Sequence, residues 1–387
     1  MRDAVVVEAV RTPVGRRKGT LQDIHPVDLS AIVLDALVHR TGLDVSVVDD
    51  VMWGCVGQVG EQAANIGRSA VLAAGWPERI PGTTIDRQCG SSQQTIHFAA
   101  ASVIAGHADV VVAGGVESMT RVPMGSARNA GPGLPFGPRV ARRYDDFEFN
   151  QGTGAEILAR RYDLSRTRLD EYSLESHHRA AQATDDGRFA NEVTPVELAD
   201  GTTFAFDEGV RRDSTLEALS GLKPAFDENG RITAGNASQI SDGAAALLVT
   251  TSERASELGL TPVARVHTAT VVGDDPITML AGPIPATAKA LKLAGLDLDD
   301  IGAFEVNEAF ASVVEAWLAE TGASRERVNP NGGAIALGHP LGGSGARLAT
   351  TLLHHLEAEG LRYGLQTMCE AGGMANATVF ENLRAGR

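Results

Sequence analysis

Apolar residues along the chain form short β-branched runs that alternate with longer alanine-rich stretches. Early in the sequence such segments lie at 4–7, 27–38, 51–56, 63–74, 99–105 and 110–112. The alternation returns at 244–249, 252–258, 263–272, 286–294, 303–306, 308–318, 348–356 and 363–368. Strand-like and helix-like segments in this order predict βαβ units and a mainly parallel, buried sheet.

The middle of the chain has a different pattern. Residues 118–243 carry a glycine and proline cluster, dense charge, and amphipathic helix candidates near 155–162 and 168–183. We therefore divide the chain into an α/β half at 1–117, an inserted loop domain at 118–243 and a second α/β half at 244–387. Two such halves suggest an internal duplication of the fold, although no strong sequence repeat accompanies it.

Composition narrows the function classes. Of 387 residues, 43% are hydrophobic and 21% are charged, which excludes extended disorder, and the formal net charge of -15 argues against general affinity for nucleic acid or anionic lipid. The apolar run at 4–7 is too short for a signal segment or a membrane span, so we expect a cytoplasmic protein. Cys55, Cys89 and Cys369 lack metal-type spacing, which predicts free thiols and no metal site.

One cysteine lies where a strand is expected to turn into a helix. Cys89 follows the strand-like 83–85 and precedes an apolar-periodic stretch with Ile96 and Phe98. A thiol at a helix N-terminus feels the positive end of the helix dipole, which lowers its pKa, and free amides there can form an oxyanion hole. The alternative is a buried cysteine that fills space, and this is the role we assign to Cys55.

A glycine-rich segment, residues 328–345, surrounds a single histidine. His339 stands between Gly338 and Pro340, where a rigid turn suits a general base and glycines admit the main chain close to a ligand. A phosphate-cradling or plain loop is the alternative. Four other histidines lie on polar helix faces or near a helix end and are expected to be solvated: His177, His178, His354 and His355.

Two further polar groups follow strand-like segments. Cys369 closes the stretch 364–368, while Asn307 stands between the strand-like 303–306 and a helix. Judged without the other motifs, Cys369 is expected to be a core residue. Asn307 is expected to be either a helix N-cap or a group that holds a catalytic water. Cysteine, histidine and asparagine suggest a papain-like hydrolase, but the papain signature is absent and a hydrolase needs no second thiol. The second thiol favours acyl transfer in which a proton moves onto or off carbon.

These motifs, in this order, resemble those of the thiolases. The resemblance rests on Cys89-Gly90-Ser91, Asn307-Glu308-Ala309-Phe310, Gly338-His339-Pro340 and Cys369 followed by glycines. It runs nearly end to end, with further agreement at Arg11-Thr12-Pro13-Val14-Gly15, Gly114-Gly115-Val116-Glu117-Ser118-Met119 and Ala234-Gly235-Asn236-Ala237-Ser238. Four separated motifs in the family's order are far more specific than any one of them.

The resemblance implies a fold and a set of ligands. The implied fold is a five-layered α/β/α/β/α core of two similar βαβαβαββ halves, with a loop domain inserted into the first half. Thiolases hold no metal and no permanently bound cofactor; acyl-CoA is the substrate and coenzyme A the co-substrate. The resemblance further implies a homodimer or homotetramer, or membership of a β-oxidation complex.

The resemblance also implies roles for individual residues. Cys89 would be the acylated nucleophile, His339 would take its proton, and Cys369 would act as acid or base at the α-carbon of the acetyl unit. Asn307, through a water, and His339 would stabilise the thioester enolate oxygen, and the amides of Cys89 and Ala371 would form a second oxyanion hole. Four residues are expected near the pantetheine or the acyl group: Ser238, Phe226, Met279 and Phe310.

The expected activity is that of an acetyl-CoA C-acyltransferase. Such an enzyme cleaves a 3-oxoacyl-CoA with CoA into acetyl-CoA and a shortened acyl-CoA through a cysteine acyl-enzyme, and the reverse reaction is a Claisen condensation. One alternative is a short-chain acetyl-CoA C-acetyltransferase that acts on acetoacetyl-CoA. The others are a ketoacyl synthase, against which Cys369 argues, and a catalytically silent CoA- or lipid-binding relative.

Three departures from the thiolase pattern affect details. Ala371 replaces a glycine, which would cost about 1–2 kcal/mol if its φ were positive. Gln93-Gln94 stand where many members carry aliphatic and basic residues. Asn150-Gln151-Gly152 stand where short-chain members have His-Met-Gly. This last difference favours degradative members that take longer or bulkier acyl groups, sterol side chains among them.

Overall fold

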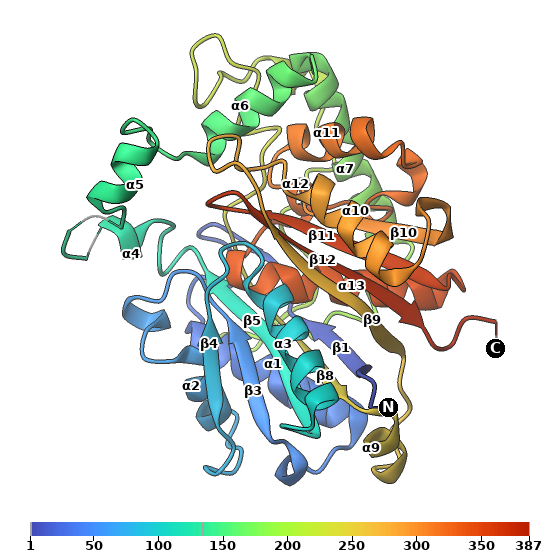
Figure 1. Cartoon of the computed structure of the whole chain (residues 1–387). Helices are drawn as coiled ribbons and strands as arrows, with labels where there is room; N and C mark the ends of the chain where they lie inside the picture. The colour runs from blue at the N-terminus through green and yellow to red at the C-terminus, as the bar shows by residue number, and fades with distance from the viewer. Residues whose placement is uncertain (1, 130, 134, 387) are drawn as a thin grey trace.

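The computed structural model describes residues 2–129, 131–133 and 135–386, which form a large mixed sheet with helices around and within it (Figure 1). The strand order is β10-β11-β12-β9-β1-β8-β5-β3-β4, with β2 paired to β8. One half of the sheet contains β1 (Val5–Arg11), β2 (Gly15–Arg16), β3 (Asp50–Gly54), β4 (Gly82–Ile85), β5 (Val110–Ser118) and β8 (Ser241–Thr250). The other half contains β9 (Ala264–Gly273), β10 (Ile301–Val306), β11 (Tyr363–Glu370) and β12 (Met374–Asn382). The halves join where β1 pairs briefly with β9.

The strand directions show that the prediction of a mainly parallel sheet is wrong. β3 runs parallel to β4 and β5, and β10 runs parallel to β11. The pairs β1–β8, β5–β8, β9–β12, β11–β12 and β1–β9 are antiparallel. Strands that are buried on both faces have continuous apolar runs whatever their direction, so the hydrophobic pattern cannot tell the two arrangements apart.

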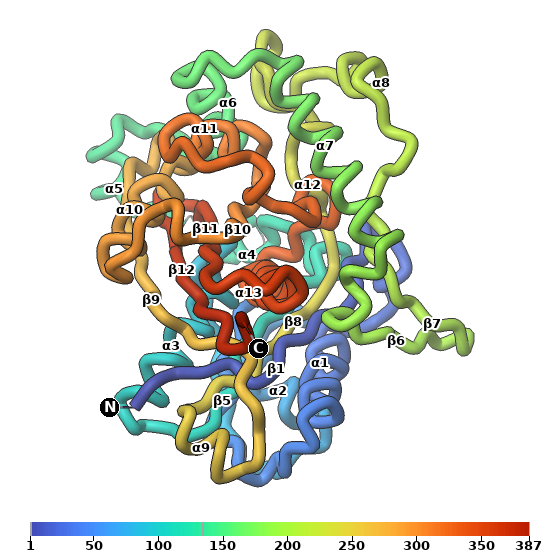
Figure 2. The backbone as a smooth tube through the Cα atoms, turned by 90° about the vertical axis from the view of Figure 1, so that its right-hand side faces the viewer, coloured from blue at the N-terminus to red at the C-terminus, as the bar shows by residue number. Residues whose placement is uncertain are grey.

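Two helices lie between the halves of the sheet. α3 (Ser91–Ala105) and α13 (Leu341–Ala358) pack on one another, and both share a buried cluster with strands of the two halves, including Leu247 of β8 and Phe380 of β12. Figure 2 shows α13 end-on in the middle of the molecule. The close approach depends on glycine, because a Cβ on Gly345 would lie 2.2 Å from the backbone nitrogen of Gln93.

The outer faces of the two halves are covered by further helices. α1 (Pro26–Thr41) and α2 (Ile66–Ala73) pack on the first half, and α10 (Pro283–Ala294) and α11 (Ala311–Thr321) pack on the second. With α3 and α13 in the middle, the layers follow the order α/β/α/β/α. The predicted five-layered core is therefore confirmed.

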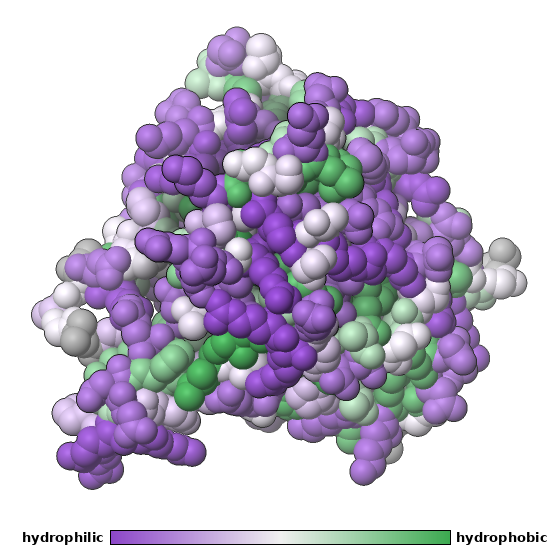
Figure 3. Space-filling view, turned by 90° about the horizontal axis from the view of Figure 1, so that it is seen from above, coloured by the Kyte–Doolittle hydropathy of each residue, from purple (hydrophilic) through white to green (hydrophobic). Residues whose placement is uncertain are grey.

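Residues 118–243, the expected inserted loop domain, contain helices that pack on the second half and a small sheet that joins the buried cluster of the first half. The elements are α4 (Ser126–Asn129), α5 (Pro138–Arg143), α6 (Gln151–Arg161), α7 (Arg166–Asp185), β6 (Val196–Glu197), β7 (Thr203–Phe204) and α8 (Leu216–Ser220). α6 and α7 lie against α11, and α7 also contacts the short α12 (Ala334–Leu337). Seen from above, the surface is mostly hydrophilic (Figure 3). α9 (Ser252–Glu257) and four single-turn 3₁₀ segments complete the described helices: Val45–Val47, Gly60–Gln62, Leu298–Asp300 and Arg325–Arg327.

A buried arginine ties the insertion to β1. Arg11 Nε lies 2.6 Å from Glu192, and its two terminal nitrogens lie 2.7 and 2.9 Å from the carboxylate oxygens of Asp207. All three side chains are buried, and the fork of hydrogen bonds satisfies the guanidinium, so the insertion is held in one orientation over the core. Over the residues that the structure describes, no helix has the length and apolar character needed to cross a membrane.

Candidate active site

The loop between β4 and α3 presents Cys89 to the interior. Gln88 adopts a left-handed conformation with φ of 51°, and Ser91 Oγ closes the turn by accepting from the Arg87 N–H at 3.0 Å and donating to the Gln88 carbonyl. Cys89 is 3% exposed and packs against Leu348 of α13 and Met368 of β11. The turn therefore places this thiol between the central helix α13 and β11, the strand that carries Cys369.

The thiol of Cys89 does not have the lowered pKa that its position predicted. Burial and the charge of Glu370 raise the pKa of Cys89 to about 12, while its own backbone N–H and the side chain of Gln151 act in the opposite direction. The helix begins at Ser91 with Gly90 as its N-cap, so Cys89 precedes the N-cap and lies outside the first turn of the helix. Desolvation outweighs the helix dipole here, and the resting group is a neutral thiol that needs a base.

His339 lies in the loop between α12 and α13 with its ring fixed. Its backbone N–H donates to Ser241 Oγ and to the Gln239 carbonyl, both at 3.2 Å. Nδ1 lies 2.6 Å from Ser344 Oγ, which itself donates to the Pro340 carbonyl at 2.8 Å. Ser344 must therefore accept a proton from Nδ1, and this leaves Nε2 unprotonated, with a lone pair that faces the amide nitrogen of Asn307.

The same histidine is neutral. Burial, together with the charge of Arg347, lowers the pKa of His339 to about 3. A neutral ring with a free Nε2 can accept a proton, which is the property required of a general base.

Asn307 leaves the end of β10 and turns towards His339. Its Nδ2 lies 3.4 Å from His339 Nε2, and its backbone N–H donates to the Thr367 carbonyl at 3.1 Å. Among the described residues its buried Oδ1 has no hydrogen-bond partner. The N-cap of α11 is Phe310, so the N-cap alternative for Asn307 is wrong. The free amide oxygen marks a polar position beside the imidazole.

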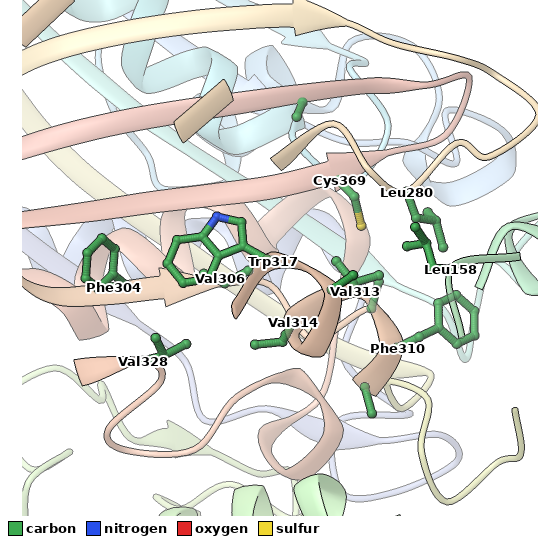
Figure 4. Packing of buried hydrophobic residues seen from close by; sticks show 14 of the residues in the cluster. Leu158, Leu280, Phe304, Val306, Phe310, Val313, Val314, Trp317, Val328 and Cys369 are labelled. Carbon is green, nitrogen blue, oxygen red and sulfur yellow. The ribbon is translucent and has the colours of Figure 1, made fainter. Parts of the chain in front are cut away.

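Cys369 lies near the end of β11 on the apolar side of the site. It is 1% exposed and belongs to the buried cluster of Met279 and Phe310, with its sulfur directed towards Val313 and Leu280 (Figure 4). Burial raises its pKa well above the ordinary value, and the charge of Cys89 adds to the rise. Met368, the residue before Cys369, packs against Cys89, so the two cysteines lie on adjoining parts of the structure although they are distant in sequence.

The hairpin after Cys369 accommodates alanine without strain. Positive φ values fall on Gly372, at 88°, and Gly373, at 75°, whereas Ala371 has no positive φ. The methyl group of Ala371 therefore carries none of the left-handed penalty considered for a residue at this position.

The four residues expected near the pantetheine or acyl group lie around one another. Met279 and Phe310 are buried in the cluster that contains Cys369, and Phe226, 47% exposed, meets the Phe310 ring edge-on at 6.0 Å between centroids. The backbone N–H of Ser238 donates to the Ala309 carbonyl, which places Ser238 beside Phe310. Gln151, at the start of α6, reaches the thiol of Cys89 from the same side.

Sequence reasoning missed two buried carboxylates that orient the site. Glu117 accepts from the backbone N–H groups of Val56 and Gly342, both at 2.9 Å, and so fixes the start of α13 next to His339. Glu308 accepts from Tyr172, Ser176 and Asn329 and from the Ile335 N–H at the glycine-rich loop. Each lies in a motif quoted from the sequence, but only the fold reveals which backbone amides it holds.

One further sequence expectation is wrong, and the two glutamines at positions 93 and 94 have defined partners. His177 is buried and its Nδ1 accepts from the Arg211 N–H at 3.1 Å, so the expectation of a solvated ring is wrong for this histidine, whereas His178 is exposed. Gln93 donates to Thr378, and Gln94 accepts from Asn376 at 3.2 Å. The two glutamines therefore bind the side of β12 that faces α3.

Comparison with known proteins shows the family to which the chain belongs. The model of "Thiolase, N-terminal domain" matches residues 4–253, and that of "Thiolase, C-terminal domain" matches residues 260–382. The chain belongs to the thiolase family. A steroid 3-ketoacyl-CoA thiolase of Mycobacterium tuberculosis is 51% identical over 99% of this chain and 95% of its own length. A 3-ketoacyl-CoA thiolase of Escherichia fergusonii is 46% identical over 99% of this chain and 100% of its own.

A solved structure has the same fold as this thiolase. The crystal structure of the Bacillus anthracis acetyl-CoA acetyltransferase is similar with a TM-score of 0.91 and 39% identity, covering 99% of both chains. Over the described part of this thiolase, no three His, Cys, Asp or Glu side chains are grouped as they would be to hold a metal ion.

Proposed function

We propose that this thiolase is an acetyl-CoA C-acyltransferase: with coenzyme A it cleaves a 3-oxoacyl-CoA into acetyl-CoA and a shortened acyl-CoA. The proposal is supported by two buried thiols, Cys89 and Cys369, of which the first packs against the residue before the second, and by a neutral histidine, His339, whose Nε2 is unprotonated. One thiol can be acylated while the other exchanges a proton with carbon. A simple hydrolase has no use for the second thiol.

The first half-reaction breaks the C2–C3 bond. His339 Nε2 takes the proton of Cys89, and the sulfur attacks the C3 carbonyl carbon. When the C2–C3 bond breaks, its electron pair forms the enolate of acetyl-CoA, and Cys369 gives its proton to C2. The thioester oxygen of the enolate lies at Asn307 and His339, where a well-placed donor is worth about 3–4 kcal/mol of barrier.

The second half-reaction transfers the acyl group from Cys89 to coenzyme A. Before this step the proton on His339 passes to the Cys369 thiolate, which restores a neutral imidazole and a neutral second thiol. The CoA thiol then loses its proton to His339, and its sulfur attacks the acyl carbonyl. When the C–S bond to Cys89 breaks, the Cys89 thiolate takes the proton back from His339. The oxyanion formed at that carbonyl accepts from the backbone amides of Cys89 and Ala371. The same groups, used in reverse order, perform a Claisen condensation of two acyl-CoA molecules.

The acyl group is a longer one than acetoacetyl. Gln151 reaches Cys89 where short-chain relatives carry methionine, and the exposed Phe226 borders the same side. The two relatives at 51% and 46% identity are named 3-ketoacyl-CoA thiolases, whereas the acetyl-CoA acetyltransferase is 39% identical. Both observations support a C-acyltransferase over the alternative, an acetyltransferase that acts on acetoacetyl-CoA.

A surface pocket in the insertion suits the nucleotide end of coenzyme A. It has a volume of about 520 Å³ and is lined by Arg211, Arg212, Ser214, Leu219 and neighbouring residues. Arginine side chains supply the charge and planar donors that phosphate needs, although Arg212 also pairs with Asp185 at 2.9 Å. Assembly into a homodimer or homotetramer, and a cytoplasmic location, belong to the same proposal.

Thiolysis with a set of substrates tests the proposal. At saturating CoA we compare acetoacetyl-CoA with a medium-chain and a sterol-like 3-oxoacyl-CoA, following substrate loss and acetyl-CoA appearance together. We expect higher kcat/KM for the longer substrates, and loss of turnover with retained CoA binding in Cys89→Ala. Cys55→Ala is the matched control, because Cys55 is equally buried but packs in a different cluster. Preference for acetoacetyl-CoA would overturn the acyl assignment, and turnover by Cys89→Ala would overturn the nucleophile.

A further inference from the structure

A third acidic group lies at the two-thiol centre and has no part in the reaction described above. Glu370 follows Cys369 at the end of β11 and is 0% exposed. Neither of its carboxylate oxygens has a hydrogen-bond partner within the described residues. A buried carboxylate without partners is costly, so its presence beside reactive groups calls for a physical account.

The carboxyl group lies against the backbone that carries the nucleophile. A Cβ built on Gly90 would meet Glu370 Oε1 at 2.1 Å and Asn376 Oδ1 at 2.2 Å, so the two oxygens flank one point next to Cys89. Asn376 Oδ1 also has no partner among the described residues, because the amide nitrogen of Asn376 faces Gln94 and His97. Two acceptor oxygens therefore face one shared space, and neither the nearby guanidinium of Arg87 nor the backbone N–H of Asn376 makes a hydrogen bond to them.

A proton on the carboxyl group supplies the missing donor. We propose that Glu370 is a positioning residue for the two thiols: protonated, it donates to the side-chain oxygen of Asn376, and ionised, it places a negative charge beside Cys89 and opposes thiolate formation there. The inference rests on the proposed function, in which Cys89 is the nucleophile. Glycine at position 90 is required because any side chain would fill the shared space.

The electrostatics of the cluster agree with this geometry. Burial raises the pKa of Glu370 to about 8, and the positive charge of Arg87 and the backbone N–H of Asn376 oppose the rise only in part. The charge of Glu370 in turn raises the pKa values of both thiols. The ionisable groups facing it are Asp86 and Arg87 before α3, Cys89, Cys369, and His97 behind Asn376, whose pKa burial lowers to about 3.

The pH dependence of thiol alkylation tests the proposal without any substrate. We measure iodoacetamide inactivation from pH 6 to 10 for the wild type, Glu370→Gln and Asp86→Asn. Glu370→Gln and wild type should react alike below pH 8, and above it the variant should react about tenfold faster, since a nearby like charge shifts a pKa by about one unit. Asp86→Asn is the matched charge control: Asp86 is an exposed neighbour of Cys89, so its effect should be uniform over the range.

A spectroscopic measurement on the wild type covers a variant that fails to fold. An infrared titration of the wild type and of Glu305→Gln, which removes the other carboxyl whose pKa is raised to about 8, should show in both proteins the carbonyl stretch of a protonated carboxyl group at pH 6 that disappears as the pH rises through 8. Absence of this band overturns the proposal, and so does an alkylation ratio between Glu370→Gln and wild type that is constant across the pH range. Thiolysis assayed in parallel separates the two failures. If the alkylation ratio does not change near pH 8 but thiolysis is normal, only the role of Glu370 is wrong. If the wild type performs no thiolysis, the proposed function is wrong.

Discussion

Replacing Ser344 by alanine tests how the base is held in its active tautomer. Ser344 Oγ accepts the Nδ1 proton of His339 over 2.6 Å while it donates to the Pro340 carbonyl. In the Ser344→Ala variant the buried N–H has no acceptor, which costs about 1–3 kcal/mol. The ring can avoid this cost by moving its proton to Nε2, where Asn307 Oδ1 becomes an acceptor once the amide turns.

The altered tautomer cannot accept a proton from Cys89. If the full 1–3 kcal/mol separates the two tautomers, acylation should slow about tenfold to hundredfold, since each 1.4 kcal/mol is tenfold. The assay is a single-turnover measurement of acyl-enzyme formation with a 3-oxoacyl-CoA, which isolates the step that uses the base. Urea unfolding of the same variant gives the change in stability separately.

A matched control lies two turns further along α13. Thr350 Oγ1 donates to the Ala346 carbonyl at 2.8 Å and is as buried as Ser344, but it does not touch His339. Thr350→Val should therefore acylate at the wild-type rate. The reasoning is refuted if folded Ser344→Ala acylates as fast as wild type, or if Thr350→Val slows to the same extent.

Three other substitutions follow from the same structure. Glu305→Gln removes a carboxyl group whose pKa burial raises to about 8, and such a group stabilises the fold below pH 4.5 and loses that contribution as the pH rises through 8. The unfolding free energy from urea titrations should therefore fall less between these pH values in the variant than in the wild type, and equal falls would contradict this. Ala371→Gly should lower the unfolding free energy by about 0.4–1 kcal/mol without raising kcat, because this φ is not positive; a higher kcat would disagree. Gly152→Ala puts a Cβ 2.1 Å from the ring of Phe226, so kcat/KM for long acyl chains should fall about tenfold, and an unchanged value would place that ring off the acyl path.

Local patterns predicted the elements well but not their directions. The alanine-rich stretches and β-branched runs correspond to helices and strands, as at α1 and β8, because periodicity reports which faces are buried. The hairpin of β11 and β12 is not predicted by the sequence analysis, which expects no strand after Gly372 and Gly373. Direction depends on pairing between segments far apart in sequence, such as β8 between β1 and β5, and no local pattern contains that information.

The candidate site was found because its residues stand in recognisable motifs, and its electrostatics were missed because they depend on burial. Position at a strand-to-helix turn suggested a lowered pKa for Cys89, whereas the covering layers raise it. Glu370 was passed over because a charged residue after a strand is ordinarily exposed. Its contact with Gly90 arises only when β11 is packed against α3. Motif spacing therefore pointed to the groups, and only their enclosure between the two halves of the large sheet determined their protonation.

That enclosure has a consequence for how the reaction starts. Desolvation raises the pKa of Cys89 to about 12 and lowers that of His339 to about 3, so both groups are uncharged in the empty site. Transfer of the proton from thiol to imidazole is strongly uphill there, and it becomes accessible only when new charge is stabilised at the same moment. In the proposed reaction, attack on the substrate carbonyl moves the negative charge from sulfur to an oxyanion held by backbone amides. Proton transfer and attack are therefore coupled in the proposed reaction, and the free thiol should react more slowly with electrophiles that form no oxyanion than with a bound thioester substrate.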